Sequence, residues 1–372
     1  MAKKVILFTL QTFSTTGGIQ KMTRTLGHSL HRAATTNNWN FELWSAYDKQ
    51  NDLMEQYLPA ASFKGFGINR IGFVLKTISS SIKPDVAILS HINLAIIGLI
   101  ITLINPKCRL WLVAHGIEVW RPLSIFQRLM LKRCDKVICV SNYTKQQMIN
   151  RHNLNSDKCF VLNNAIDPFM RLPDTFAKPQ SLLKHYGLHD DDFILFSLTR
   201  LASTEQYKGY DQVISVLGNL KSKFPQIKYV LSGKYDNEEY IRIKKMIAVH
   251  DVSEHVILTG FIDEAQLTEH FLLADLFVLP SKKEGFGIVF IEALACGLPV
   301  ICGNTDGSID AIRDGELGEA IDPDNLTELN DAITRHVQKH ITANSRKSLQ
   351  EKCIHHFNEH DYMTKLEQLI NE

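Results

Sequence analysis

The 372-residue sequence lacks the patterns of a metal centre, a disulfide framework and a dinucleotide site. Its seven cysteines include no Cys-x-x-Cys pair and their number is odd, which argues against zinc and paired disulfides and favours a reducing compartment. No Gly-x-Gly-x-x-Gly follows the first apolar run, and no acidic residue ends a second strand about 20 residues later. A nicotinamide-dependent dehydrogenase is therefore disfavoured.

A hydrophobic run long enough to cross a membrane is also missing. Residues 86–104 are strongly apolar, but His91 and Asn93 interrupt them, and a spanning helix needs about 20 apolar residues. This segment predicts a buried strand, a polar turn and a core helix. The first ten residues contain no small-residue cleavage site, so they predict a first strand rather than a signal peptide. We expect a cytoplasmic protein.

The net charge of +1 is unevenly distributed. Residues 1–167 contain 20 basic and 9 acidic side chains, a balance of +11, whereas residues 168–372 contain 21 and 31, a balance of −10. This split predicts an anionic partner for the first half, such as a polyprenyl-diphosphate-linked acceptor or peripheral contact with the inner face of the cell membrane. The helical stretch 125–133 adds three basic residues beside apolar ones. Alternatively, the two halves attract each other. No dense basic run with interleaved aromatics is present, so nucleic acid is not expected.

Short continuous apolar runs recur along the chain, each followed by a helical pattern, and this is typical of parallel strands covered on both faces. Two doubly wound α/β domains of Rossmann type are predicted, and three prolines near residues 165–190 mark the seam between them. The runs occupy residues 5–10, 86–90, 109–114, 136–140, 159–162, 193–198, 228–232, 256–260, 276–280 and 299–302.

Two candidate sites follow strands of the first half. Gly17 and Gly18 precede a helix, where glycine lets the backbone approach a phosphate and the helix N-terminus offers N–H groups. The alternative is an ordinary strand-to-helix turn. His115 follows the strand at 109–114 and could bond a sugar hydroxyl or carry a proton. A purely structural histidine is the alternative.

In the second half, Arg200 closely follows the strand at 193–198 and Lys208 opens the next helix. A forked guanidinium and a mobile ammonium make a clamp suited to a diphosphate, and a solvated surface pair is the alternative.

The most informative segment runs from Glu284 through Gly-Phe-Gly to Glu292, a loop that turns into a helix. Eight residues at a helical rise of about 1.5 Å separate the two acids by about 12 Å, the length of a nucleotide-sugar. That span is too long for a glycosidase pair, which requires about 5–9.5 Å. The backbone N–H groups of Gly287, Ile288 and Val289 are expected to face the diphosphate.

This segment resembles the E-x7-E signature of the retaining glycosyltransferases of family 4, which have the GT-B fold. The resemblance covers nearly the whole chain. It includes Gly17-Gly18, His115-Gly116, the Arg200 and Lys208 pair, Gly260-Phe261-Ile262, and the segment from Asn163 to Asp167.

The resemblance implies a retaining hexosyltransferase of polysaccharide or glycolipid assembly that uses no metal or cofactor other than its nucleotide-sugar co-substrate. Residues 1–170, with a C-terminal helix at about 352–372 packing back on them, would bind the acceptor. Residues 171–351 would bind the donor.

The resemblance also implies residue roles. Glu292 would hold the ribose, Glu284 the donor sugar, and Arg200 and Lys208 the leaving diphosphate, while Phe261 and Ile262 would lie at the base. His115 would be catalytic, together with Glu284, Arg200 and Lys208.

Two departures from the family pattern concern the donor sugar and the linker. The chain has Asp306-Gly-Ser-Ile-Asp310 where many members have Gly-Gly-x-x-Glu, and Ala165 where glycine is usual. A UDP-sugar is the favoured donor and GDP-mannose its main competitor. The alternatives in other classes are a sugar-nucleotide epimerase of GT-B fold and a non-catalytic nucleotide-sugar-binding module.

Overall fold

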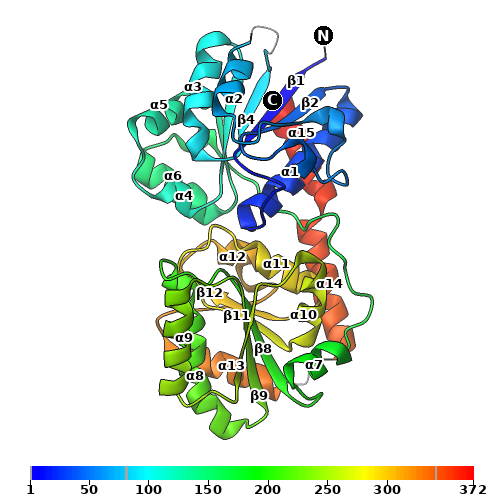
Figure 1. Cartoon of the computed structure of the whole chain (residues 1–372), viewed down its shortest axis with the longest axis vertical. Coiled ribbons are helices and arrows are strands. Elements are labelled where there is room, and N and C mark those ends of the chain that lie inside the picture. Colours follow the sequence, from blue (N-terminus) through cyan, green and yellow to red (C-terminus); the bar gives the residue numbers. More distant parts are fainter. Residues whose placement is uncertain (1, 80–82, 340–341) are drawn as a thin grey trace. The chain divides into compact units, whose positions relative to one another are not determined.

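The computed structural model describes residues 2–79, 83–339 and 342–372. The chain divides into two compact units, one formed by Met1–Phe169 with Phe357–Glu372 and the other by Met170–His356. In each unit, helices cover both faces of a sheet (Figure 1).

The first unit contains a parallel sheet whose seven described strands have the order β3-β2-β1-β4-β5-β6-β7. The strands are β1 (Lys4–Thr9), β2 (Asn40–Ser45), β3 (Phe63–Gly65), β4 (Val86–Leu89), β5 (Arg109–Ala114), β6 (Lys136–Cys139) and β7 (Cys159–Val161). The helices are α1 (Gly18–Asn37), α2 (Arg70–Ile78), α3 (Ala95–Ile104), α4 (Ile117–Trp120), α5 (Ile125–Arg133), α6 (Asn142–His152) and α15 (Glu359–Asn371). Because β4 returns to the other side of β1, the strand order reverses between β1 and β4.

The predicted continuous runs form the core of this sheet. All four residues of β4 and the last five of β1 are buried. Phe73, Ile97 and Met130 pack on the sheet from α2, α3 and α5. Apolar strands covered on both faces are what a parallel sheet requires.

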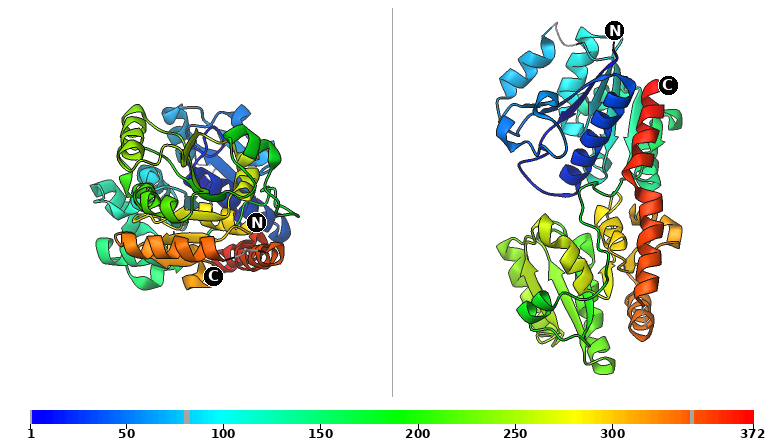
Figure 2. Two further views of the ribbon diagram at one scale, coloured as in Figure 1. Left: turned by 90° about the horizontal axis from the view of Figure 1, so that it is seen from below. Right: turned by 90° about the vertical axis from the view of Figure 1, so that its right-hand side faces the viewer.

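The C-terminal helix α15 packs against α1, and the right-hand view of Figure 2 shows the two side by side. Glu359 begins α15 and accepts hydrogen bonds from Ser29 (2.9 Å) and Arg32 (3.0 Å), with His28 Nδ1 2.5 Å away. Burial acts to raise the pKa of Glu359, but these partners outweigh it and lower that pKa. The contact ties the last residues of the chain into the first unit.

The second unit contains a parallel sheet whose six described strands have the order β10-β9-β8-β11-β12-β13. The strands are β8 (Phe193–Leu198), β9 (Ile227–Ser232), β10 (Val256–Gly260), β11 (Leu276–Leu279), β12 (Val300–Gly303) and β13 (Glu319–Ile321). The helices are α7 (Gln180–Tyr186), α8 (Tyr210–Lys223), α9 (Asn237–Val249), α10 (Leu267–Leu273), α11 (Ile288–Ala295), α12 (Ser308–Ala311), α13 (Leu326–Gln338) and α14 (Ala343–Phe357). Here the order reverses between β8 and β11.

The apolar segment 86–104 forms β4, a 3-10 turn (Ile92–Leu94) and α3, as predicted. The expectation of a core helix is only half right, because Ile97 and Ile101 are buried whereas Ile96 and Leu103 are exposed. In the described parts of the chain, no helix has the length and apolar character needed to cross a membrane.

Candidate functional site

In an open parallel sheet, ligands bind beyond the carboxyl ends of the strands at the point where the strand order reverses. In the second unit this point lies between β8 and β11. The loop after β8 carries Arg200 and Lys208, and the loop after β11 carries Glu284. The topology therefore gathers three predicted site residues at one edge of the sheet.

Lys208 and Glu284 form a half-buried ion pair, with 2.7 Å between Lys208 Nζ and Glu284 Oε1. Burial acts to lower the pKa of Lys208, but the charge and hydrogen bond of Glu284 outweigh it and raise the pKa. Gly209 brings the two loops together, since its φ is 87° and a Cβ there would clash with the Pro280 carbonyl. Lys208 therefore presents a permanent positive charge at the sheet edge.

The backbone of Glu284 is held by the segment that departs from the family pattern. Asp306 Oδ2 accepts from Glu284 N at 2.6 Å, and Gly307 N donates to the Glu284 carbonyl at 2.8 Å. Burial first, and then the charge of Glu284, raises the pKa of Asp306 to about 7. Asp306, which the sequence analysis did not treat as a site residue, thus positions the Glu284 loop.

The N-terminus of α11 lies directly after this loop. Gly287 occupies the N-cap position with φ 79°, and among the described residues no side chain caps the helix. Polar N–H groups of Gly287, Ile288 and Val289 are therefore available to an anion. Glu292, one turn further along α11, is 5% exposed. The N–H groups at the start of α11 suit the predicted contact with a diphosphate, and Glu292 is the second polar group that α11 carries.

Arg200 lies two residues beyond the end of β8, and its side chain is 70% exposed. Its Nη2 lies 2.5 Å from Glu205 Oε1. Arg200 and Lys208 pair with different acids, Glu205 and Glu284 respectively. The two predicted clamp residues therefore differ in exposure, since Arg200 pairs with Glu205 at the surface and Lys208 pairs with Glu284 in a shielded position.

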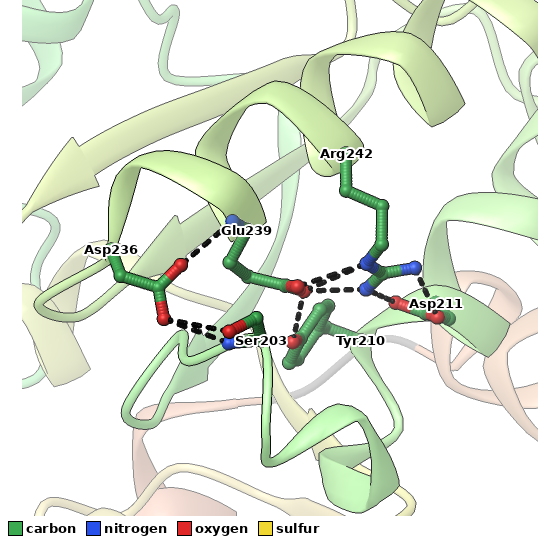
Figure 3. Close-up of polar contacts among 6 residues, drawn as sticks. All are labelled: Ser203, Tyr210, Asp211, Asp236, Glu239 and Arg242. Carbon is green, nitrogen blue, oxygen red and sulfur yellow. Dashed lines mark hydrogen bonds and ion pairs between the residues drawn. The ribbon is translucent and has the colours of Figure 1, made fainter.

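A polar network that the sequence analysis missed anchors the Arg200–Lys208 segment. Asp236 accepts from the Ser203 N–H (2.9 Å) and caps α9 through Glu239 N (2.8 Å). Arg242 bridges Glu239, which is fully buried, and Asp211, which is partly exposed, as Figure 3 shows. From the sequence alone, Asp211 on α8 and Glu239 on α9 resemble ordinary solvent-exposed acids of amphipathic helices. The packing of the two helices is what brings both acids to Arg242.

Phe261 and Ile262, predicted to contact the base, follow edge strand β10. Gly260 has φ 75° and its carbonyl accepts from Gly233 N at 2.8 Å. Phe261 is 54% exposed whereas Ile262 is buried. One strand, β9, lies between β10 and β8 in the sheet, so Phe261 and Ile262 follow a strand two positions from the one that the Lys208 loop follows.

In the first unit, Gly17 and Gly18 begin α1 at the corresponding reversal between β1 and β4. No side chain in the described chain caps this helix, and a Cβ on Gly18 would meet no atom within 4 Å. The loop before it is organised by buried Asp48, which accepts from the N–H groups of Thr12 (2.6 Å) and Ser14 (2.9 Å). Asp48 has no motif around it, so the sequence analysis did not single it out.

His115 lies after β5 and donates from Nε2 to the Ser90 carbonyl at 2.8 Å. Burial lowers the pKa of His115 to about 4, so the imidazole is neutral at pH 7. Its Nδ1 is then a hydrogen-bond acceptor. This tautomer suits a bond from a sugar hydroxyl better than the proton-carrying role that the sequence analysis also allowed.

No group of three or more His, Cys, Asp or Glu side chains in residues 2–79, 83–339 and 342–372 could hold a metal ion. All seven cysteines are buried and free.

Each of the two units matches a known protein family. Residues 180–355 match the family "Glycosyl transferases group 1", and residues 16–168 match "Glycosyltransferase Family 4". A GDP-mannose-dependent alpha-(1-6)-phosphatidylinositol monomannoside mannosyltransferase of Mycolicibacterium smegmatis is 30% identical over 232 residues, which cover 59% of this chain and 58% of the relative. An alpha-D-kanosaminyltransferase of Streptomyces kanamyceticus is 24% identical over 56% of this chain and 53% of the relative. The chain thus matches little more than half the length of these relatives.

Solved structures share the fold over the whole chain. The Anabaena protein HepE in complex with UDP and glucose superposes with a TM-score of 0.78 at 18% identity, covering 99% of both chains. Sucrose-phosphate synthase from Thermosynechococcus elongatus gives a TM-score of 0.79 at 18% identity, covering 99% of this chain and 98% of the other. These likenesses and the two parallel sheets confirm the predicted GT-B fold class. The two family matches show that the chain is a glycosyltransferase with a family 4 domain at residues 16–168 and a group 1 domain at residues 180–355.

Proposed function

We propose that this chain is a retaining, metal-independent hexosyltransferase that moves a sugar from a nucleotide-sugar to a saccharide or lipid-linked acceptor. The observation that carries the proposal is the fixed Lys208–Glu284 pair beside the uncapped start of α11. Cleavage of a nucleotide-sugar leaves negative charge on the diphosphate. A fixed ammonium and free backbone N–H groups stabilise such charge as it develops.

The predicted residue roles are retained as part of this proposal. Lys208 and Arg200 would bind the diphosphate with the N–H groups of α11, Glu284 would bind the donor sugar, and Glu292 the ribose. Phe261 and Ile262 would contact the base, Gly17 and Gly18 are proposed as donor-binding residues, and His115 is proposed as a catalytic residue. A bound diphosphate would give Lys208 a second anionic partner besides Glu284.

A UDP-sugar remains the first candidate donor. GDP-mannose is the second candidate. Its support comes from relatives 30% identical to this chain that are named as GDP-mannose-dependent. The same names specify a phosphatidylinositol monomannoside acceptor, which supports a lipid-linked acceptor here. The basic first half of the chain supports an anionic acceptor and peripheral contact with an anionic membrane.

Nucleotide binding and turnover test the proposal. Thermal unfolding is measured with UDP, GDP, UDP-sugars and GDP-mannose, since a ligand that binds the folded state raises the unfolding midpoint. The donor that stabilises the protein is then incubated with it, and the products are analysed. Free nucleoside diphosphate is the expected product. An epimerised sugar would support the epimerase, and binding without turnover in the presence of candidate acceptors would support the non-catalytic module.

A further inference from the structure

Helix α3 is apolar on its outer face as well as on its inner face. Ile97 and Ile101 pack into the core, yet Ile96 is 56% exposed and Leu103 is 79% exposed. A helix that is apolar all round normally lies in a protein core or in a membrane. Ten residues extend about 15 Å, too short to cross a bilayer, which needs about 20 residues. The outer face of α3 therefore suits a surface contact rather than a span.

The two neighbouring helices also carry exposed apolar residues. Helices α2 and α5 both pack against α3, and Figure 1 shows the three together. On α2, Ile71 and Leu75 are exposed one turn apart, and on α5 Ile125 and Phe126 are exposed at the start of the helix. Single exposed apolar residues are ordinary, but several of them on three helices that pack together favour a binding surface. We call the exposed residues Ile71, Leu75, Ile96, Leu103, Ile125 and Phe126 the apolar face.

The charged residues around the apolar face are mostly basic. Residues 64–134 contain ten lysines and arginines but only two acids, Asp85 and Glu118. Both acids already accept hydrogen bonds, Asp85 from Lys4 N and Glu118 from His115 N. The exposed cations on or beside the three helices are Arg70, Lys76, Lys107, Arg128, Lys132 and Arg133. Apolar side chains bordered by unopposed cations complement a bilayer whose headgroups are anionic.

We propose that the outer faces of α2, α3 and α5 form a membrane-docking surface that enters the headgroup and acyl boundary of an anionic bilayer. The proposed function includes peripheral contact with an anionic membrane, and the docking surface rests on that contact and gives it a location. None of the residues of the apolar face belongs to the proposed donor site. Membrane docking and donor binding can therefore be measured separately on the same full-length protein.

Vesicle co-sedimentation tests the surface. The wild type should bind vesicles of equal parts phosphatidylglycerol and phosphatidylcholine at low salt, and should bind pure phosphatidylcholine weakly. Replacing Arg128, Lys132 and Arg133 with glutamine should weaken binding about a hundredfold, because each cation near the surface contributes about fivefold. Ile125→Ser with Phe126→Ser should weaken binding even at low salt.

Helix α9 supplies matched controls from the second unit. Ile241 and Val249 are as exposed as the residues of the apolar face, and Lys244 and Lys245 are exposed cations on the same helix. Ile241→Ser with Val249→Ser, and Lys244→Gln with Lys245→Gln, should leave vesicle binding unchanged. All variants should keep the wild-type thermal midpoint and the same shift with nucleotide, which shows that they are folded and competent to bind the donor.

Several outcomes would overturn the docking surface. One is a wild type that shows the nucleotide-induced shift but ignores anionic vesicles, which would leave the proposed transferase intact. Another is equal loss of vesicle binding in the α9 controls. A third is concentration-dependent dimerisation that the apolar-face variants abolish without any vesicle binding, which would identify a second copy of the chain as the occupant. Vesicle binding without any nucleotide binding would instead refute the proposed transferase and leave the surface standing.

Discussion

Lys208 Nζ lies 2.7 Å from Glu284 Oε1, although the two residues are 76 positions apart in the chain. Both side chains are largely shielded from solvent, with 13% and 15% exposed. A pair so placed keeps the ammonium protonated and fixed before any ligand arrives. In the proposed reaction, this fixed charge faces the departing diphosphate and needs no reorganisation as the bond to the sugar breaks.

We predict that Lys208→Ala slows sugar transfer by roughly 10²–10³, the usual effect of removing one donor that stabilises transition-state charge. Arg200→Ala should slow transfer as well, because the guanidinium is proposed to bind the same diphosphate. Steady-state rates of nucleoside diphosphate release measure both. Lys221→Ala is the control, since Lys221 forms an ion pair of similar length, 2.8 Å to Asp251, at the surface and outside the proposed site. Near-normal rates in folded Lys208→Ala and Arg200→Ala would show that these two residues do not stabilise the leaving diphosphate.

Asp306 should give the protein a specific pH dependence. Its pKa is raised from an ordinary 3.8 to about 7, so the folded state holds more protons than the unfolded chain between these values. The contribution of Asp306 to the free energy of unfolding therefore falls as pH rises from 3.8 to about 7. Asp306→Asn removes this titration. Urea unfolding across the window should show the variant gaining stability relative to the wild type as pH rises, and a difference independent of pH would contradict the assignment.

Activity should persist in excess EDTA, because Lys208, Arg200 and the N–H groups of α11 are proposed to neutralise the diphosphate in place of a cation. The measurement compares initial rates before and after dialysis against EDTA, with a metal-dependent glycosyltransferase as a positive control for chelation. Loss of activity that magnesium or manganese restores would defeat the metal-free mechanism.

The sequence was sufficient to predict which residues lie at the sheet edges, because parallel strands bring their carboxyl ends to one side. This reasoning selected Arg200, Lys208 and Glu284 from strand ends alone. It could not foresee that Lys208 pairs with Glu284, since the pairing depends on the left-handed turn at Gly209 and its close approach to Pro280.

Burial was the harder property to predict. Helix α3 consists almost entirely of apolar residues, and such a sequence cannot reveal which side the core covers. Glu239 stands among charged residues on α9, yet it is fully buried by contacts from α8. Tertiary packing decides both cases, so the apolar face and the polar network emerged only from the structure.

Arg242 is expected to be the residue on which the stability of this polar network depends. Arg242 holds Glu239 and Asp211, with Nη1 and Nη2 2.8 and 2.7 Å from the two Asp211 oxygens. Arg242→Ala would leave the carboxylate of Glu239 buried without its cation. Breaking a buried pair from one side costs about 3–5 kcal/mol, and the lower end applies because Arg242 is 29% exposed. Urea unfolding measures the loss of stability.

The matched control is Arg335→Ala, because Arg335 forms an ion pair with Glu319 but is 59% exposed. Exposed pairs contribute about 0–1 kcal/mol, so this variant should unfold near the wild-type midpoint. The network also anchors Ser203, between Arg200 and Lys208, through Asp236 and α9. Arg242→Ala should therefore lower the rate of transfer at temperatures where the variant remains folded, whereas Arg335→Ala should not. A folded Arg242→Ala protein with a wild-type rate would show that the network stabilises the unit without positioning the loop.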